Sequence, residues 1–340
     1  MKLGIIGAAG AGKKTVFEAL TKNTAGVGHS GESQIGTIAV PDERVDILSK
    51  MYNPRKTIFA QVEYFLPGRK STKNDPNAWN DVRDCDALIH VVRNFKGFGA
   101  EAPNPGADIL ALDQEMIFAD LVVVEKRLER IELDNKRGKN INPEESTLLQ
   151  KCLEILNSEK PLRINPELAA SPALRGFAFV SGRPVLILFN NDDEDESMPD
   201  AGAMMNTDNV MVIRAKLEVE LAQMSLEEAE EFLAEFNITA SAMDRVIKKS
   251  YEILGLISFF TVGEDEVRAW TIKARTEAVD SADVIHSDIK KGFIRAEVVA
   301  YNDLMDAGNY QEAKKRGTVR LEGKTYIVQD GDIINFRFNV

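Results

Sequence analysis

The sequence has few cysteines, which limits the metal and redox chemistry it can support. Only Cys85 and Cys152 are present among 340 residues. Two cysteines this far apart build neither a metal-ligand cluster nor a disulfide framework, and a reduced compartment is the default for such a chain. We therefore expect each cysteine to be a buried structural residue.

Long apolar runs and an excess of basic charge are also missing. No stretch reaches the roughly 18 apolar residues of a membrane-spanning helix, and no signal peptide is recognisable, so a cytoplasmic location is expected. The chain has 54 acidic against 42 basic residues, a net charge of −12. This balance argues against wholesale coating of nucleic acid, and no DNA partner is expected. The acid is concentrated at residues 192–196 and 227–231.

The most informative segment is glycine-rich and lies near the N-terminus. Residues 3–6 are apolar and predict a short strand, and residues 15–20 predict a helix. Between them stands G-x-x-x-x-G-K, the spacing of a phosphate-binding Walker A loop. Its backbone N–H groups would form an anion-binding nest at a helix N-terminus, and its lysine would reach the terminal phosphates. The predicted nucleotide-binding residues here are Gly7, Gly10, Ala11, Gly12, Lys13, Lys14 and Thr15.

One position of this motif is unusual. The residue after Lys13 should be serine or threonine, whose hydroxyl binds Mg²⁺, but the chain has Lys14. The loop therefore predicts phosphate binding without predicting magnesium.

Strand and helix signals alternate around this loop, which predicts an α/β domain. Two long helical patterns at residues 109–136 and 143–156 predict an antiparallel hairpin inserted between strands. From residue 256 the chain becomes strand-rich, which predicts a small α+β domain. Strands are expected at residues 37–40, 59–65, 86–92, 185–189, 210–213, 259–262, 267–272, 319–321 and 326–328. Further helices are expected at residues 42–52, 225–236 and 241–254, with loops at 24–34 and 69–77 and a turn at 330–332.

Several stretches together resemble a known family. They are the P-loop and residues 41–44, 86–93, 266–271, 291–298, 326–332 and 336–340. With these motifs the whole chain resembles the YchF/Ola1-type subfamily of Obg-related P-loop NTPases.

The resemblance implies three parts. A Ras-like P-loop nucleotide-binding domain would comprise residues 1–100 and 175–255. A coiled-coil helical hairpin would occupy residues 101–174, and a β-rich TGS-like (β-grasp) domain residues 256–340. The family is cytosolic, prefers ATP to GTP and associates with the ribosome, so ATP or GTP and ribosomal RNA are the expected ligands, the RNA reached through the hairpin and the TGS-like domain.

The chain departs from the family where magnesium should bind. Lys14 replaces the family serine, Phe65 replaces the aspartate of Asp-x-Ala-Gly, and Ser30 stands for the switch I threonine within a shortened segment. The base-recognition motif becomes Asn190-Asn191-Asp192-Asp193, and Arg214-Ala215-Lys216 replaces the Ser-Ala-Lys-like segment.

These departures predict a nucleotide-binding switch with weak or absent hydrolysis, because positioning and metal charge supply most of phosphoryl transfer. Either Lys14 partly replaces the cation, or it faces solvent and the pocket is a remnant. Two alternatives stay open: an active Mg²⁺-dependent ATPase or GTPase using Thr15 or Ser30 as metal ligand, and a scaffold that binds no nucleotide.

Base choice and RNA contact also stay open at this point. Asn190, Asn191 and Asp193 are expected to bind nucleotide, and Asp193 would favour guanine unless the acidic run is only a solvated loop. His29 is expected in a loop, His90 in the core, and His286 without a partner. A basic face for ribosomal RNA is predicted from Lys290, Lys291, Arg295, Lys314, Lys315 and Arg316.

Overall fold

The computed structural model describes residues 1–22, 32–68, 79–97, 101–140, 142–202, 209–235 and 241–339. His29, Ser30 and the predicted loop at residues 69–77 lie outside these ranges, as does most of the loop at residues 24–34. The chain divides into two units, which we describe separately. The N-terminal unit comprises Met1–Thr37 and Glu63–Val246, and the C-terminal unit comprises Ile38–Val62 and Ile247–Val340.

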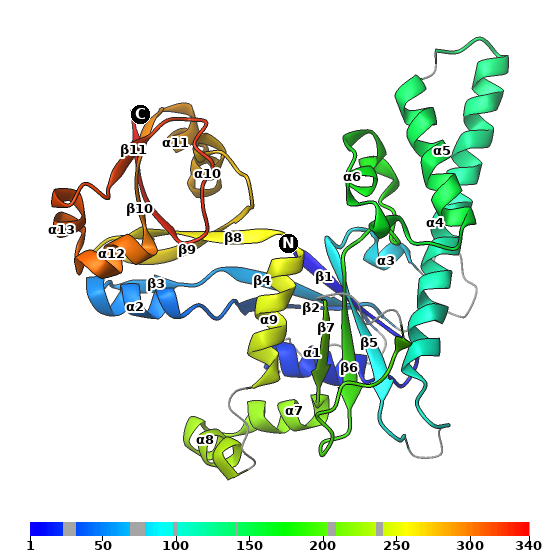
Figure 1. Ribbon diagram of the computed structural model, residues 1–340, viewed down its shortest axis with the longest axis horizontal. Coiled ribbons are helices and arrows are strands. Elements are labelled where there is room, and N and C mark those ends of the chain that lie inside the picture. The colour runs from blue at the N-terminus through cyan, green and yellow to red at the C-terminus, as the bar shows by residue number, and fades with distance from the viewer. Residues whose placement is uncertain are drawn as a thin grey trace. The chain divides into compact units, whose positions relative to one another are not determined.

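A six-stranded sheet of order β2-β4-β1-β5-β6-β7 organises the N-terminal unit (Figure 1). Neighbouring strands from β4 to β7 pair in parallel. Parallel strands covered on both faces are continuous apolar runs, and six consecutive residues of β5 are buried. The strands are β1 (Lys2–Ile6), β2 (Gln34–Ala39), β4 (Gln61–Leu66), β5 (Ala87–Asn94), β6 (Val185–Asn191) and β7 (Val210–Ile213).

The helices predicted at residues 15–20, 225–236 and 241–254 are present, whereas the helix at residues 215–223 is one that the sequence pattern does not predict. The capping box at Ser225 is confirmed: its N–H donates to Glu228 Oε2 at 2.9 Å, and the Glu228 N–H donates to Ser225 Oγ at 3.3 Å. The shorter elements are α1 (Lys13–Thr21), α3 (Asn80–Arg83), η1 (Leu162–Ile164), α6 (Pro166–Ala169), η2 (Pro172–Phe177), α7 (Ala215–Gln223), α8 (Leu226–Glu235) and α9 (Ala242–Ile253), which runs across the division between the units.

The predicted helical hairpin is present as α4 (Pro105–Lys136) and α5 (Pro143–Asn157), which lie side by side (Figure 1). Each begins with an asparagine N-cap followed by proline, so α4 starts before the periodic pattern does. Asp120 anchors α4 to the rest of the unit. Its buried carboxylate accepts hydrogen bonds from the N–H groups of Val180 and Ser181, at 3.1 and 2.7 Å, and pairs with Arg83 at 3.2 Å.

The C-terminal unit is a β-grasp sheet of order β11-β10-β12-β8-β9 with β3 added beside β9. The antiparallel pairs β8–β9 and β10–β11 flank β12, which runs parallel to β8, and α10 covers a core around Phe259 and Phe336. The elements are α2 (Glu43–Tyr52), β3 (Lys56–Ile58), β8 (Leu256–Val262), β9 (Glu266–Lys273), α10 (Ala278–Ile285), α11 (Ser287–Lys291), β10 (Phe293–Ala300), α12 (Tyr301–Ala307), α13 (Tyr310–Lys315), β11 (Arg320–Glu322) and β12 (Asp332–Phe338).

The strand predicted at residues 326–328 is wrong. Only Ile327 forms an isolated bridge, with Glu277. The buried carboxylate of Asp332 accepts from the Tyr326 hydroxyl at 2.8 Å and from the Gln329 N–H at 2.9 Å. These bonds hold the segment as a turn that leads into β12, so its apolar residues have no partner strand.

Candidate phosphate-binding site

The glycine-rich loop joins β1 to α1 and requires glycine at two positions. Gly7 and Gly12 have φ values of 146° and 90°, which side-chain-bearing residues rarely adopt. A Cβ on Gly7 would lie 2.3 Å from the Val91 carbonyl oxygen, and one on Gly12 would lie 2.3 Å from Asn190 Nδ2. The backbone therefore follows a path that only this glycine spacing permits.

Helix α1 begins without a side-chain cap. Its N-cap is Gly12, which has no side chain to accept a hydrogen bond, and no acidic residue lies in its first turn. Its first two residues are Lys13 and Lys14. Helix N-termini carry partial positive charge and usually attract acidic residues, so this charge pattern is unfavourable until an anion binds.

Lys13 folds back onto the loop. Its ammonium donates to the carbonyl oxygens of Gly7 at 2.7 Å and Ala8 at 2.8 Å. Burial lowers the pKa of Lys13 from its ordinary value. The Lys13 ammonium is thus partly desolvated beside the glycine-rich loop, where a bound phosphate would give it an oppositely charged partner.

Lys14 points along the helix surface. Its side chain is 71% exposed, and its Nζ lies 3.3 Å from Glu18 Oε1, four residues later. Thr15 is half-buried. Phe65 pairs in register with Gly4 and packs among Ile6 and Trp79, so this position presents a phenyl ring.

The described residues do not fit the magnesium site of related P-loop enzymes. No group of three or more His, Cys, Asp or Glu side chains suited to a metal occurs among them. The hydroxyl expected after the loop lysine is an ammonium, and the carboxylate expected at the end of β4 is a phenyl ring.

Asn190 links the loop to the start of α7. Its Nδ2 donates to the Ala11 carbonyl at 3.1 Å, and its Oδ1 accepts from the Ala215 N–H at 3.1 Å. Sequence reasoning proposed Asn190 as a base contact and missed this bridge, which joins residues 179 apart and has no local signal. Asn190 therefore holds the loop in shape from across the sheet.

Asn191 faces a different set of partners. Its Nδ2 donates to the carbonyl oxygens of Asp195 and Ser197, at 3.1 and 2.8 Å, and its Oδ1 accepts from Asn94. The side chain thereby organises the acidic run that follows β6. It contacts this run rather than the phosphate loop.

The acidic run is paired with the Arg214-Ala215-Lys216 segment. Lys216 Nζ donates to Asp193 Oδ2 at 3.1 Å, and Arg214 pairs with Glu196 at 2.7 Å. Asp193 raises the pKa of Lys216 through this hydrogen bond. Asp193 therefore lies beside Lys216, and the preceding residue, Ala215, is the hydrogen-bond partner of Asn190.

His90 is a core residue, as expected. It lies in β5 opposite Ile6, is 1% exposed, and its Nε2 has no hydrogen-bond partner among the residues that the structure describes. Burial, with smaller contributions from Arg163 and Lys13, lowers the pKa of His90 to about 3. Both cysteines are likewise free and buried, which confirms the prediction, and burial raises the pKa of each thiol to about 11.

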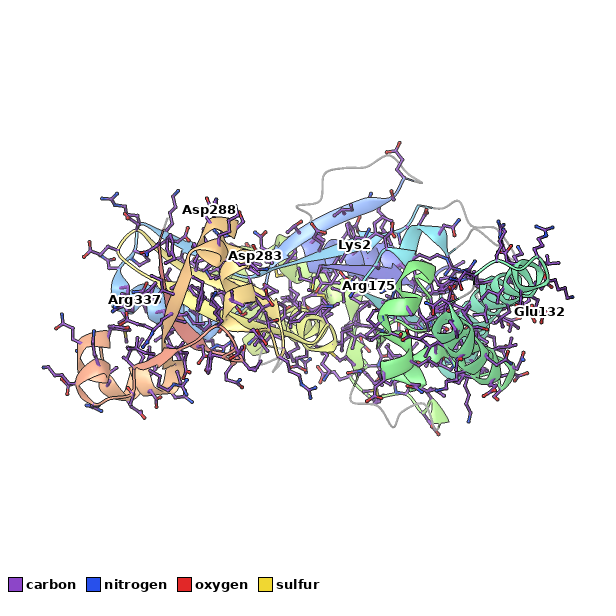
Figure 2. The ribbon with its side chains drawn as sticks, turned by 90° about the horizontal axis from the view of Figure 1, so that it is seen from above. Lys2, Glu132, Arg175, Asp283, Asp288 and Arg337 are labelled. Atoms are coloured by element: carbon purple, nitrogen blue, oxygen red, sulfur yellow. The ribbon has the colours of Figure 1, made fainter. Side chains whose placement is uncertain are left out.

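Most of the predicted basic residues already have acidic neighbours. Lys290 lies 3.0 Å from Asp280 and 3.1 Å from Asp283, and Lys291 lies 3.1 Å from Asp288; Figure 2 labels the last two carboxylates. Lys314, Lys315 and Arg316 also lie within 4.0 Å of glutamate oxygens. These ion pairs reduce the net positive charge around the predicted basic residues.

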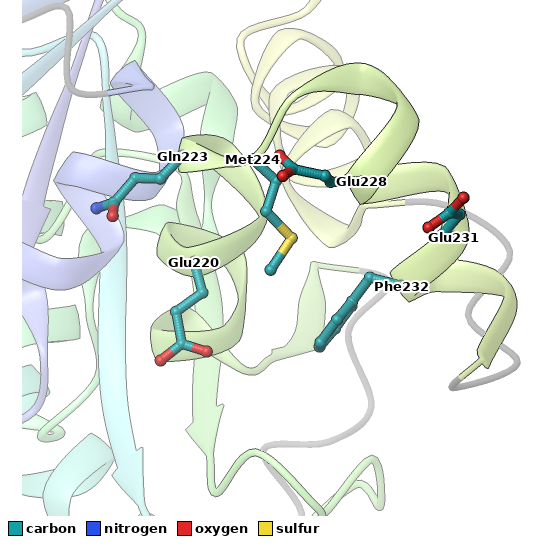
Figure 3. Close-up of a pocket in the computed structure, with 6 residues that line it drawn as sticks. All are labelled: Glu220, Gln223, Met224, Glu228, Glu231 and Phe232. Carbon is teal, nitrogen blue, oxygen red and sulfur yellow. The ribbon is translucent and has the colours of Figure 1, made fainter.

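A separate hollow of about 590 Å³ lies between α7 and α8 (Figure 3). Its lining is Glu220, Gln223, Met224, Glu228, Glu231 and Phe232. Three carboxylates would repel a triphosphate, so this hollow is not a second nucleotide site.

Three features together define a P-loop α/β protein. They are the parallel sheet, the glycine-rich loop after β1, and the helix α1 that begins at this loop without a side-chain cap. Comparison with known proteins narrows this class. Residues 256–339 match a family model described as YchF-GTPase_C, protein of unknown function (DUF933). The chain is 36% identical to the ribosome-binding ATPase YchF of Bacillus subtilis, over 99% of each protein. It is 33% identical to the protein of the same name from Escherichia coli O157:H7, over 100% of this chain and 99% of the relative.

Solved structures agree with this relationship. The Schizosaccharomyces pombe YchF GTPase superposes with a TM-score of 0.85 at 28% identity, over 99% of this chain and 97% of the other. A GTP-binding protein from Pyrococcus horikoshii shares the fold, with a TM-score of 0.59 at 19% identity over 100% of both chains. The chain belongs to the YchF family.

Proposed function

We propose that this chain is a ribosome-associated purine-nucleotide-binding protein of the cytoplasm, with weak or absent hydrolysis. Its relatives in Bacillus subtilis and Escherichia coli carry the name ribosome-binding ATPase. The glycine-rich loop before α1, in a fold shared with a YchF GTPase, supports binding of ATP or GTP here. None of the helices among the described residues is long and apolar enough to span a bilayer.

The observation that carries the proposal is the charge pattern at the start of α1. Each lysine in a first turn costs up to about 1 kcal/mol against the helix dipole. The exposed ion pair of Lys14 with Glu18 returns only about 0.3–0.5 kcal/mol. A bound triphosphate reverses the sign of this balance, because both ammonium groups then face negative charge. In the structure the Lys14 ammonium pairs with Glu18, so it reaches the phosphates only by leaving that exposed pair and turning toward the helix N-terminus, the direction in which helical side chains tilt.

Lys14 and Phe65 stand where a magnesium site would have a hydroxyl and a carboxylate, and they argue against efficient hydrolysis of the nucleotide. A metal ion contributes several kcal/mol to the stabilisation of the phosphoryl-transfer transition state, and each 1.4 kcal/mol is about tenfold in rate. An ammonium carries a single positive charge and is no Lewis acid, so it would supply less charge neutralisation than a divalent ion. The proposal is therefore that Lys14 supplies a second positive charge for binding without replacing the metal in catalysis.

Thermal unfolding with ATP or GTP, in EDTA and in Mg²⁺, tests the proposal. We expect either nucleotide to raise the melting temperature in EDTA, less so in Lys14→Ser and not at all in Lys13→Ala. Lys50→Ser removes an exposed lysine of α2 and serves as the matched control. An absence of stabilisation in every condition would contradict nucleotide binding. Mg²⁺-dependent turnover comparable to that of a YchF relative assayed alongside would contradict weak hydrolysis.

Ribosome association has its own test. Co-sedimentation of the purified chain with ribosomes should occur at low salt and weaken as salt rises if phosphate contacts contribute. Pelleting that is absent, or that is unaffected by salt, would count against RNA contact.

A further inference from the structure

The segment between β2 and β4 is part of the C-terminal unit, although both strands belong to the sheet that carries the phosphate loop. The chain leaves the N-terminal unit after Thr37 and returns at Glu63. Within this excursion, β3 pairs in parallel with β9, matching Lys56 to Glu266 and Ile58 to Arg268. Helix α2 buries Val45 and Leu48.

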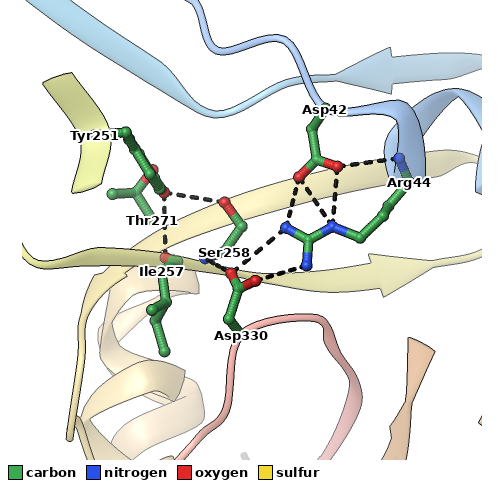
Figure 4. A network of polar contacts seen from close by, with 7 residues as sticks. All are labelled: Asp42, Arg44, Tyr251, Ile257, Ser258, Thr271 and Asp330. Atoms are coloured by element: carbon green, nitrogen blue, oxygen red, sulfur yellow. Dashed lines mark hydrogen bonds and ion pairs between the residues drawn. The ribbon is translucent and has the colours of Figure 1, made fainter. Parts of the chain in front are cut away.

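Arg44 fastens this segment to the β-grasp core (Figure 4). Its guanidinium donates to both carboxylate oxygens of Asp42, at 2.9 and 2.8 Å, and to Asp330 Oδ2 at 2.7 Å. Asp330 Oδ1 in turn accepts from the Ser258 N–H at 2.9 Å. The guanidinium also lies 5.1 Å from the centre of the Phe260 ring. Planar two-point bonding of this kind is specific to arginine.

Asp42 and Gly331 determine the surroundings of the Arg44 guanidinium. Asp42 caps α2 by accepting from the Arg44 N–H at 3.0 Å, so one carboxylate fixes both the helix start and the guanidinium. A Cβ on Gly331 would lie 3.0 Å from Arg44 Nη1, so a side chain there would crowd the guanidinium. Burial opposes the charge on Arg44, but the hydrogen bonds of Asp42 and Asp330 raise its pKa above the ordinary value.

We propose that Arg44 couples nucleotide binding at the phosphate loop to the stability of the C-terminal unit, an inference that rests on the proposed function. Strand β4 pairs with β1, which ends at the loop, and β2 lies at the other side of β4. A nucleotide that reduces the conformational freedom of β1 also reduces that of β4 and β2. These two strands continue directly into the segment that Arg44 holds. Ordering at one site then reduces the ordering needed at the other, which is a recognised route of coupling.

Hydrogen–deuterium exchange of the full-length protein, with and without saturating GTP or ATP, tests this inference. We expect nucleotide to slow exchange of the amides of residues 7–16 and also of β8 and β12, the latter by about fivefold or more, the lower range of such couplings. In Arg44→Gln the effect on residues 7–16 should remain and the effect on β8 and β12 should be lost.

The controls separate this inference from its premise. Arg55→Gln breaks an exposed pair between the same segment and Asp265, with side chains 84% and 86% exposed, and should leave the nucleotide effect intact. Asp330→Asn gives a second, milder break of the network if Arg44→Gln fails to fold. Protection of residues 7–16 alone in the wild type, or protection of β8 and β12 that survives both variants, would overturn the coupling. A wild type that shows no protection at residues 7–16 would refute the proposed function itself.

Discussion

The buried histidine below the phosphate loop makes a quantitative prediction about stability and pH. His90 has a pKa of about 3 in the folded chain against 6.5 ordinarily. The unfolded chain therefore holds an extra proton between these values, and stability falls as pH drops below 6.5. The slope is about 1.4 kcal/mol per pH unit and the loss levels off only near pH 3. Between pH 7.5 and pH 5.0 the loss from this residue alone is about 2 kcal/mol.

Substitution isolates this contribution from that of the carboxylates. His90→Leu keeps a similar volume, removes the titrating group and removes the unpartnered Nε2. Urea unfolding of both proteins should give a free-energy difference that grows by about 2 kcal/mol in favour of the variant from pH 7.5 to pH 5.0. Met116→Leu, another buried position on this side of the sheet, should show a constant difference. A pH-independent difference for His90→Leu would refute the reasoning.

Three further predictions concern the loop, the hairpin and the acidic run. Gly12→Ala should abolish the nucleotide-induced rise in melting temperature, whereas Gly317→Ala, with similar positive φ but open space around it, should keep that rise. Asp120→Ala should lower the free energy of unfolding by about 3 kcal/mol, since it leaves buried donors unpaired; a loss below about 1 kcal/mol would contradict this. Asp193→Asn should weaken GTP relative to ATP by about tenfold in competition for a fluorescent nucleotide, because the amide cannot accept from guanine as the carboxylate does. Equal weakening of both nucleotides would show that Asp193 does not read the base.

The parts of the fold that sequence could predict are those with local signals. The loop is recognisable from the spacing of Gly7, Gly12 and Lys13, and the helical hairpin and α8 are recognisable from apolar periodicity and the cap at Ser225. The short helices α10 to α13 give no such pattern and are not predicted. The excursion of residues 38–62 into the second sheet could not be predicted, because β3 is three residues long and its partner β9 is far along the chain. Non-local pairing of that kind leaves no pattern in either strand.

The residues of the candidate site also divide into those with a local sequence signal and those without one. Lys14 and Phe65 could be read as departures because each stands at a fixed place in a motif. Asn190 bridges the phosphate loop to α7, and Asn191 holds the acidic run that follows β6. Both roles depend on backbone groups brought together by the fold, and backbone groups carry no sequence signature. The distinction matters for function, since Asn190 shapes the loop while Lys14 sets its charge.

The most direct test of the central claim is the dissociation constant for nucleotide with and without divalent metal. Isothermal titration of the wild-type chain with GTP and with ATP, once in EDTA and once in Mg²⁺, measures it. Two ammonium groups and an uncapped helix N-terminus predict that binding persists in EDTA, within about tenfold of its strength in Mg²⁺, a difference of about 1.4 kcal/mol. Binding detected only with Mg²⁺, or in neither buffer, would contradict the account.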